Sequence, residues 1–185
     1  ERLAAKMCGR WRNGVPLELS PTTPDPQPPL APGSYNAFDY RTPPTMGPGD
    51  GAGLRCPAGA HIRRANPRSA EVLGGMGGRL RLIRRGMPYG PPYDPAKPHD
   101  GIARGLLGLF LCVGLEDQFE FIMRHWINDG LFARGLNPGE KDPMIGAQAD
   151  GCTFTFPRAG GAPVSTTGLA RFVQTRGSAY LFFPS

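Results

Sequence analysis

The chain has 185 residues, a net charge of +6 and a sequence pI near 9.5, and 39% of its residues are hydrophobic. This length is sufficient for one domain with a hydrophobic core. The basic charge alone would suggest nucleic acid, but no lysine or arginine block, helix-turn-helix pattern or zinc-finger spacing accompanies it, so a nucleic-acid partner is not expected. No apolar run reaches the length of a membrane span, so a membrane partner is not expected either.

The chain contains four cysteines, which lie far apart and form no C-x-x-C pair: Cys8, Cys56, Cys112 and Cys152. This spacing indicates neither a zinc site nor a disulfide framework. We expect mostly buried thiols in a reducing compartment, and therefore a cytoplasmic protein. The sequence opens on Glu1 rather than Met, in what reads as the middle of a helix, so we expect that residues are missing before it and leave an export signal open.

The first segment carries apolar residues at every fourth position, namely Leu3, Met7 and Trp11. This stripe predicts a helix over residues 1–11 that packs on one side and ends at the following Asn-Gly pair. Residues 13–54 are rich in proline and glycine, which predicts a long ordered or partly disordered loop. Within this loop, the aromatic patch at residues 36–40 is expected to fasten the loop to the body of the protein.

The second half of the chain alternates apolar segments with turns. The run GLLGLFLCVG at residues 105–114 is the most continuous apolar stretch and predicts the central strand of a sheet. Apolar spacing predicts a helix over residues 116–128, with two acids in its first turn. Shorter strands are expected at residues 80–85, 153–156, 169–174 and 178–183. Together these elements predict an α+β fold with an antiparallel or mixed sheet.

One histidine, His61, lies in a turn punctuated by glycine and proline, close to a basic cluster. From His61 to Arg85 inclusive, the chain has seven arginines and one acid, Glu71. Such a cluster needs an anionic partner, and a haem would explain both features, because its iron takes a neutral imidazole and its propionates take arginine donors. The alternatives are a histidine without a ligand role and a solvated or nucleic-acid-binding basic face. The GGMGG run at residues 74–78 lacks the G-K-[ST] ending of a phosphate loop, so we interpret it as a hinge.

The segments CPAGAHIRRANPR and IRRGMPYGP resemble the haem-binding core of the dye-decolorising peroxidases. The flanking segments ERLAAKMCGRW, GLFLCVGLEDQFEFIMRHWIND and FVQTRGSAYLFFPS extend the resemblance over nearly the whole chain. It implies one ferredoxin-like half of a two-half fold, forming a single haem-binding domain over residues 1–185. It also implies that His61 is the axial iron ligand of haem b and that Arg84 is the distal, catalytic arginine. The other implied cofactor-binding residues are Arg63, Asn66 and Arg68.

The resemblance further implies a peroxidase that uses hydrogen peroxide to oxidise dyes, phenols or similar small-molecule reductants. An acid bonded to the far nitrogen of His61 is expected just after the apolar strand, where Glu116 and Asp117 are the candidates. The G-x-x-D-G aspartate of the family has no counterpart, because GAQADG at residues 146–151 is one residue too long. We therefore expect weak or partner-dependent activity, with a non-catalytic haem-binding protein as the alternative. A missing N-terminal half also predicts an exposed apolar patch, covered by that half or in a homo-oligomer.

Overall fold

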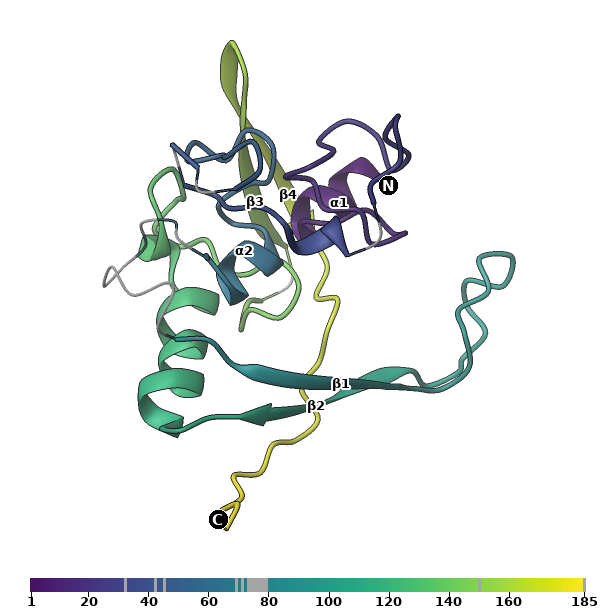
Figure 1. The fold of residues 1–185 in the computed structure, drawn as a ribbon. Helices are drawn as coiled ribbons and strands as arrows, with labels where there is room; N and C mark the ends of the chain where they lie inside the picture. The colour runs from purple at the N-terminus through teal and green to yellow at the C-terminus, as the bar shows by residue number, and fades with distance from the viewer. Residues whose placement is uncertain are drawn as a thin grey trace.

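The computed structural model describes residues 1–31, 33–41, 43–44, 46–68, 70, 72, 80–149 and 151–184. Short helices alternate with two antiparallel strand pairs, β1 with β2 and β3 with β4 (Figure 1). This arrangement confirms the expected α+β class. The expected hinge at residues 74–78 lies outside the described residues.

The first helix, α1 (Arg2–Cys8), ends earlier than the sequence predicts. Gly9 follows it with a φ of +95°, a left-handed conformation that favours glycine, and its N–H donates to the carbonyl of Ala5 at 2.7 Å. A Cβ at Gly9 would lie 2.3 Å from Cγ1 of Ile62. The glycine therefore both ends α1 and allows the chain to approach the next helix closely.

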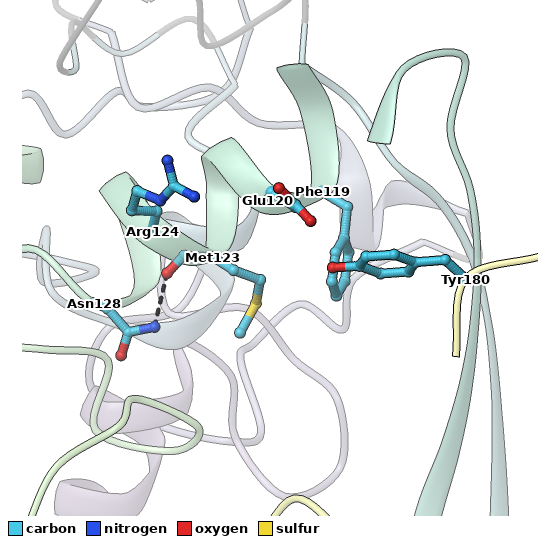
Figure 2. A pocket seen from close by; sticks show the side chains of 6 residues that line it. All are labelled: Phe119, Glu120, Met123, Arg124, Asn128 and Tyr180. Atoms are coloured by element: carbon cyan, nitrogen blue, oxygen red, sulfur yellow. Dashed lines mark hydrogen bonds between the residues drawn. The ribbon is translucent and has the colours of Figure 1, made fainter. Parts of the chain in front are cut away.

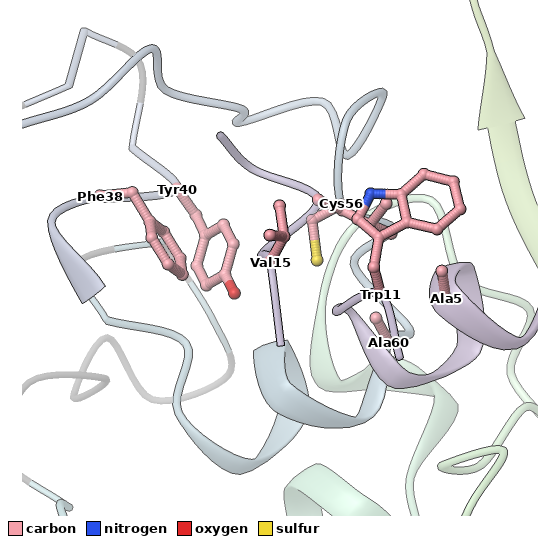
Figure 3. Packing of buried hydrophobic residues seen from close by; sticks show 8 residues of the cluster. Ala5, Trp11, Val15, Phe38, Tyr40, Cys56 and Ala60 are labelled. Atoms are coloured by element: carbon pink, nitrogen blue, oxygen red, sulfur yellow. The ribbon is translucent and has the colours of Figure 1, made fainter. Parts of the chain in front are cut away.

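The first core lies between α1, the proline-rich loop and the residues that precede the second helix. Figure 3 shows its buried side chains, which are Ala5, Trp11, Val15, Leu17, Phe38, Tyr40, Cys56 and Ala60. Two of these come from the aromatic patch, where the rings of Phe38 and Tyr40 pack edge to face with centroids 5.5 Å apart. The loop has one short regular element, η1 (Ser34–Asn36), within the described residues. The prediction that residues 36–40 fasten this loop is confirmed.

The short helix α2 (His61–Ala65) contacts α1 on one side and η3 on the other. His61 was expected in a turn, but it is the first residue of this helix. The predicted helix at residues 116–128 is confirmed as two π-helical segments, η2 (Leu115–Glu120) and η3 (Ile122–Ile127). The short η4 (Gly130–Phe132) follows it. The second core packs around η3 and consists of Leu80, Ile122, Trp126, Ile127 and Phe132.

The strands β1 (Ile83–Tyr89) and β2 (Gly105–Leu111) form a two-stranded ribbon, which is the long arm in Figure 1. The prediction that residues 105–114 form the central strand of a sheet is wrong, because β2 pairs with β1 alone among the described strands. Its side chains are largely exposed, with Leu107 at 61%. A continuous apolar run indicates a strand whose two faces are usually buried, but the run does not show which other segment buries them.

The strands β3 (Cys152–Arg158) and β4 (Gly161–Leu169) form a hairpin, which confirms the strand predicted at residues 153–156. The strands predicted at residues 169–174 and 178–183 are wrong. Residues 170–184 have no regular secondary structure and form an extended, exposed tail (Figure 1). Their alternating pattern fits a strand, but the described part of the chain offers them no strand partner.

No described helix combines the length and the apolar character that a membrane crossing requires. The four cysteines, all within the described residues, form no disulfide. Cys56 is buried and the other three are partly exposed, so the expectation of mostly buried thiols is wrong. Burial raises the pKa of the Cys56 thiol to about 12, which keeps this thiol protonated at neutral pH.

Candidate functional site

The site begins with His61, which α2 presents at its first turn. Nδ1 of His61 lies 2.9 Å from Oδ2 of Asp142, and the His61 side chain is 21% exposed whereas that of Asp142 is fully buried. In a neutral imidazole, a carboxylate at this distance accepts a hydrogen bond from Nδ1–H, and the lone pair of the ring then lies on Nε2. The partly exposed ring therefore has a fixed tautomer and an available nitrogen ligand.

The Asp142 carboxylate is held on both of its oxygens. Oδ1 accepts hydrogen bonds from the backbone N–H groups of Met144 at 2.8 Å and Ile145 at 2.9 Å, while Oδ2 faces His61. The backbone N–H of Asp142 donates to the carbonyl of Ile127 at 2.7 Å. Three independent bonds therefore fix this carboxylate in its orientation toward the imidazole.

Asp142 corrects the expectation that Glu116 or Asp117 would be the acid beside His61. Both of these residues lie exposed in the first turn of η2, where their charges complement the helix dipole. Asp142 instead lies in the segment KDPMIG, residues 141–146, which comes after η4 in the chain. The only local sequence feature that marks Asp142 is the Asp-Pro pair. In such pairs the aspartate carboxylate commonly accepts hydrogen bonds from the backbone N–H groups of the residues that follow. That signal indicates a turn, and nothing in it indicates a partner 81 residues earlier in the chain.

The structure places Arg63 in the first core. Its Nη1 donates to the carbonyl of Cys56 at 2.8 Å and lies 3.3 Å from Oδ2 of Asp50, and its guanidinium stacks over the ring of Tyr40 at 4.4 Å. Two residues along a helix correspond to about 200° of rotation, so Arg63 points away from His61. In this structure the Arg63 guanidinium binds the protein itself, which differs from the cofactor-binding role that the resemblance implies.

Arg68 and Asn66 also contact the protein. Nη1 of Arg68 donates to the carbonyls of Asn36 and Phe38, each at 3.0 Å, and its guanidinium lies 3.8 Å from the centroid of the Phe38 ring. Asn66 follows α2 and its side-chain oxygen accepts the N–H of Arg68 at 3.2 Å. In this structure Arg68 fastens the loop to the segment after α2, and Asn66 bonds the backbone of Arg68.

Arg84 lies exposed on β1, opposite Phe110 of β2, and its neighbour Arg85 lies opposite Leu109. Adjacent residues of a strand point to opposite faces, so Arg84 and Arg85 lie on opposite faces of β1. Arg84 is therefore on an element separate from His61, and the ribbon that carries it is open on both faces.

A surface pocket of about 290 Å³ lies on another part of the molecule (Figure 2). It is lined by Phe119, Glu120, Met123, Arg124, Asn128 and Tyr180, none of which belongs to the predicted site. The hydroxyl of Tyr180 donates to Glu120, which raises the pKa of this tyrosine. Among the described residues, no group of three or more His, Cys, Asp or Glu side chains could hold a metal ion.

No protein-family model matches the chain. Curated relatives do match it over nearly its full length. Peroxidase 2 of Mycetinis scorodonius is 32% identical over 99% of this chain and 38% of its own length. A dye-decolorizing peroxidase of Exidia glandulosa is 30% identical over 98% of this chain and 36% of its own length. The chain thus spans less than two fifths of the length of these relatives.

Solved structures give the same result. A fungal DyP-type peroxidase from Auricularia auricula-judae matches with a TM-score of 0.70 and 28% identity, over 92% of this chain and 40% of that one. The F194W mutant of the dye-decolorizing peroxidase from Pleurotus ostreatus matches with a TM-score of 0.65 and 27% identity, over 91% and 38%. These likenesses confirm the expected ferredoxin-like α+β fold. The curated and structural neighbours are thus dye-decolorizing peroxidases, and the chain is similar to a C-terminal part of them over nearly its whole length.

Proposed function

We propose that this chain is the haem-bearing part of a peroxidase that uses hydrogen peroxide to oxidise dyes, phenols or similar reductants. The observation that carries the proposal is the pair formed by His61 and Asp142. Among the related solved structures, one dye-decolorizing peroxidase is a complex with 2,6-dimethoxyphenol, which supports a phenolic reductant. The family relationship supports haem b as the cofactor.

The residues present fit an iron ligand on the His61 side. A neutral imidazole binds iron through one nitrogen, and its other N–H is then available for a second partner. In this chain Nδ1 has that partner in Asp142, and among the described residues Nε2 has no hydrogen-bond partner. Nε2 of His61 would therefore hold the iron. The exposed Arg84 of the β1 ribbon would be the candidate for anionic groups of the cofactor or its substrate.

Each protein group has a definite chemical role in this proposal. Haem, when bound, would supply the redox chemistry of peroxide. Asp142 accepts the hydrogen bond from Nδ1–H, which increases the electron density of the imidazole. Nε2 therefore becomes a stronger electron-pair donor to a metal. The guanidinium of Arg84 would orient peroxide and stabilise the negative charge that develops as the O–O bond breaks.

The acid–base residue of the reaction is proposed to come from outside the described chain. The G-x-x-D-G motif that the family uses has no match in this sequence, and the nearest acid in GAQADG, at position 150, lies outside the described residues. A general acid–base group contributes about a hundredfold or more in rate. We therefore expect weak turnover from the chain alone and stronger turnover when the remaining part of a full-length relative is supplied.

Binding is tested by adding haemin to the purified chain and recording the Soret band. We expect a band in the wild type and in His99→Ala, an exposed-histidine control, and its loss in His61→Ala. Added imidazole should restore the band in His61→Ala, because it replaces the missing ligand. A Soret band of wild-type position and intensity in His61→Ala would refute ligation by His61.

Turnover is tested by peroxide-dependent bleaching of an anthraquinone dye. Arg84→Ala should lower the rate by about a hundredfold, whereas Arg85→Ala, on the opposite face of β1, serves as the matched control. If the wild type binds haem but bleaches no more dye than Arg84→Ala, this chain has no peroxidase activity of its own, and the proposal is reduced to haem binding.

A further inference from the structure

Arg64 is a completely buried arginine of α2, three residues after His61. Its guanidinium makes four hydrogen bonds, all to backbone carbonyls. Nη1 donates to Trp126 at 2.6 Å and to Asp129 at 2.9 Å, Nη2 donates to Glu140 at 2.9 Å, and Nε donates to Gly59 at 3.3 Å. No carboxylate of the described residues forms an ion pair with it.

These carbonyls belong to three segments that are distant in sequence. Gly59 precedes α2, Trp126 and Asp129 lie at and just after the end of η3, and Glu140 begins the segment that carries Asp142. The last carbonyls of a helix have no partner within the helix, so a cation there satisfies them and complements the helix dipole. Arg64 therefore joins the histidine helix, the end of η3 and the aspartate segment at one point.

The aspartate segment is anchored on both sides of its turn toward His61. The carbonyl of Glu140 accepts the bond from Arg64, and two residues later the N–H of Asp142 donates to Ile127 at 2.7 Å. Both anchors lead back to the end of η3, which Arg64 holds through Trp126. Loss of the guanidinium would release the Glu140 carbonyl and the η3 terminus together.

We propose that Arg64 is the positioning residue of the site, which holds the Asp142 carboxylate against Nδ1 of His61 without contacting His61 itself. Its significance for haem rests on the proposed function, but the positioning itself is a property of the chain alone. Lysine could not replace it, since a single ammonium group cannot reach carbonyls in four directions from a planar fork.

The electrostatics agree with this geometry. Burial lowers the pKa of Arg64, and the nearby charges of Asp142, Glu140 and Asp129 oppose that effect. Arg64 and Asp142 attract each other electrostatically. Removal of the guanidinium would therefore affect the Asp142 carboxylate in two ways, through the lost backbone hydrogen bonds and through the lost positive charge.

The test uses the chain without haem and the NMR signal of the His61 Nδ1–H proton. Exchange of this proton with water reports the bond to Asp142, and Asp142→Asn should abolish its protection. In Arg64→Lys, we expect exchange at least about tenfold faster than in the wild type. The double variant should exchange no faster than Asp142→Asn alone, because Arg64 acts through Asp142. Unchanged exchange in folded Arg64→Lys, or additive effects in the double variant, would overturn the proposal.

Arg63→Lys is the matched control. It changes the adjacent buried arginine, whose partners Asp50 and Tyr40 lie in the first core. This variant should leave the His61 exchange rate unchanged. An equal acceleration in Arg63→Lys would mean that any disturbance of α2 loosens the pair, and the specific role of Arg64 would be lost.

If Arg64→Lys does not fold, the wild type provides the decisive measurement. The Nε–H of Arg64 and the Nδ1–H of His61 should exchange through one shared local opening, with the same free energy and the same dependence on urea. Different opening energies would overturn the proposal. Neither readout requires haem, so a chain that fails to bind haem can still confirm the role of Arg64. Conversely, haem ligation by His61 with unchanged exchange would refute only this role.

Discussion

Glu18 is a buried carboxyl group whose ionisation should lower the stability of the protein. The residue is 1% exposed, and neither carboxylate oxygen has a hydrogen-bond partner among the described residues. Burial, with a further contribution from the nearby Asp50, raises the pKa of Glu18 from its ordinary value of 4.5 to about 7. The folded protein therefore binds this proton more tightly than the unfolded chain does.

This difference fixes the sign of the pH dependence. The contribution of Glu18 to the free energy of unfolding is complete below about pH 4.5, decreases as the pH rises toward about 7, and stays constant above that value. At about 1.4 kcal/mol per pH unit, the interval corresponds to a loss of about 3 kcal/mol. Glu18→Gln keeps the shape of the side chain but cannot ionise, so the variant should not show this loss.

The assay is urea unfolding of the wild type and of Glu18→Gln at about pH 4.5 and about pH 8. The stability of the variant relative to the wild type should increase by about 3 kcal/mol between the two pH values. Glu116→Gln, an exposed glutamate, is the control and should show no such increase. An increase below about 1 kcal/mol would mean that Glu18 ionises in the folded protein near its ordinary pH, and the argument from burial would be wrong.

Three further predictions concern close packing, the site and the ribbon. Gly9→Ala should destabilise the fold by about 2 kcal/mol or more, measured by urea unfolding, because its Cβ would lie 2.3 Å from Ile62; an unchanged midpoint would contradict this. Asp142→Asn should weaken haem binding about tenfold or more in a haemin titration, and unchanged affinity would show that the His61 bond is dispensable. The chain alone should self-associate in sedimentation and bind an apolar dye, and Leu107→Glu with Leu109→Glu should reduce both; a wild-type monomer without dye binding would contradict the exposed patch.

The elements that the sequence predicted correctly depend on local spacing. Three elements were predicted from the spacing of apolar residues close together in the sequence. They are α1, the helix over η2 and η3, and the first strand of the hairpin. The same reasoning failed for residues 169–174 and 178–183. Alternation shows that a segment suits a strand, but pairing requires a second strand, which the described chain does not supply to the tail.

The site was only partly predictable, because its central contact joins residues 81 positions apart. The motif around His61 identified the imidazole, but the choice between Glu116, Asp117 and Asp142 depends on how η3 and the following segment fold back onto α2. Arg64 shows the same limit. In the sequence it is one basic residue of a cluster, and its role appears only when three segments converge on its guanidinium.

The arginine cluster shows why composition indicates a charge but not its use. Arg63 and Arg68 bind the first core and its loop, Arg64 binds the end of η3, and Arg84 remains exposed on the ribbon. If only the number of positive residues were considered, all four arginines would be assigned to one anionic partner. The resemblance to the dye-decolorising peroxidases was the feature that distinguished Arg84, and its place on an open strand face would allow it to reach a ligand.

The two sides of the proposed site are built with different degrees of completeness. His61 contacts Asp142, and Arg64 bonds the segment that carries Asp142, so the described chain itself supplies these contacts on the ligand side. Arg84 lies on a ribbon whose apolar faces are uncovered, so the peroxide side depends on whatever covers that ribbon. In this chain, haem binding and turnover should therefore respond to different substitutions. Substitutions at Asp142 should act first on affinity, substitutions at Arg84 should act on rate, and only the rate should increase when a covering polypeptide is added.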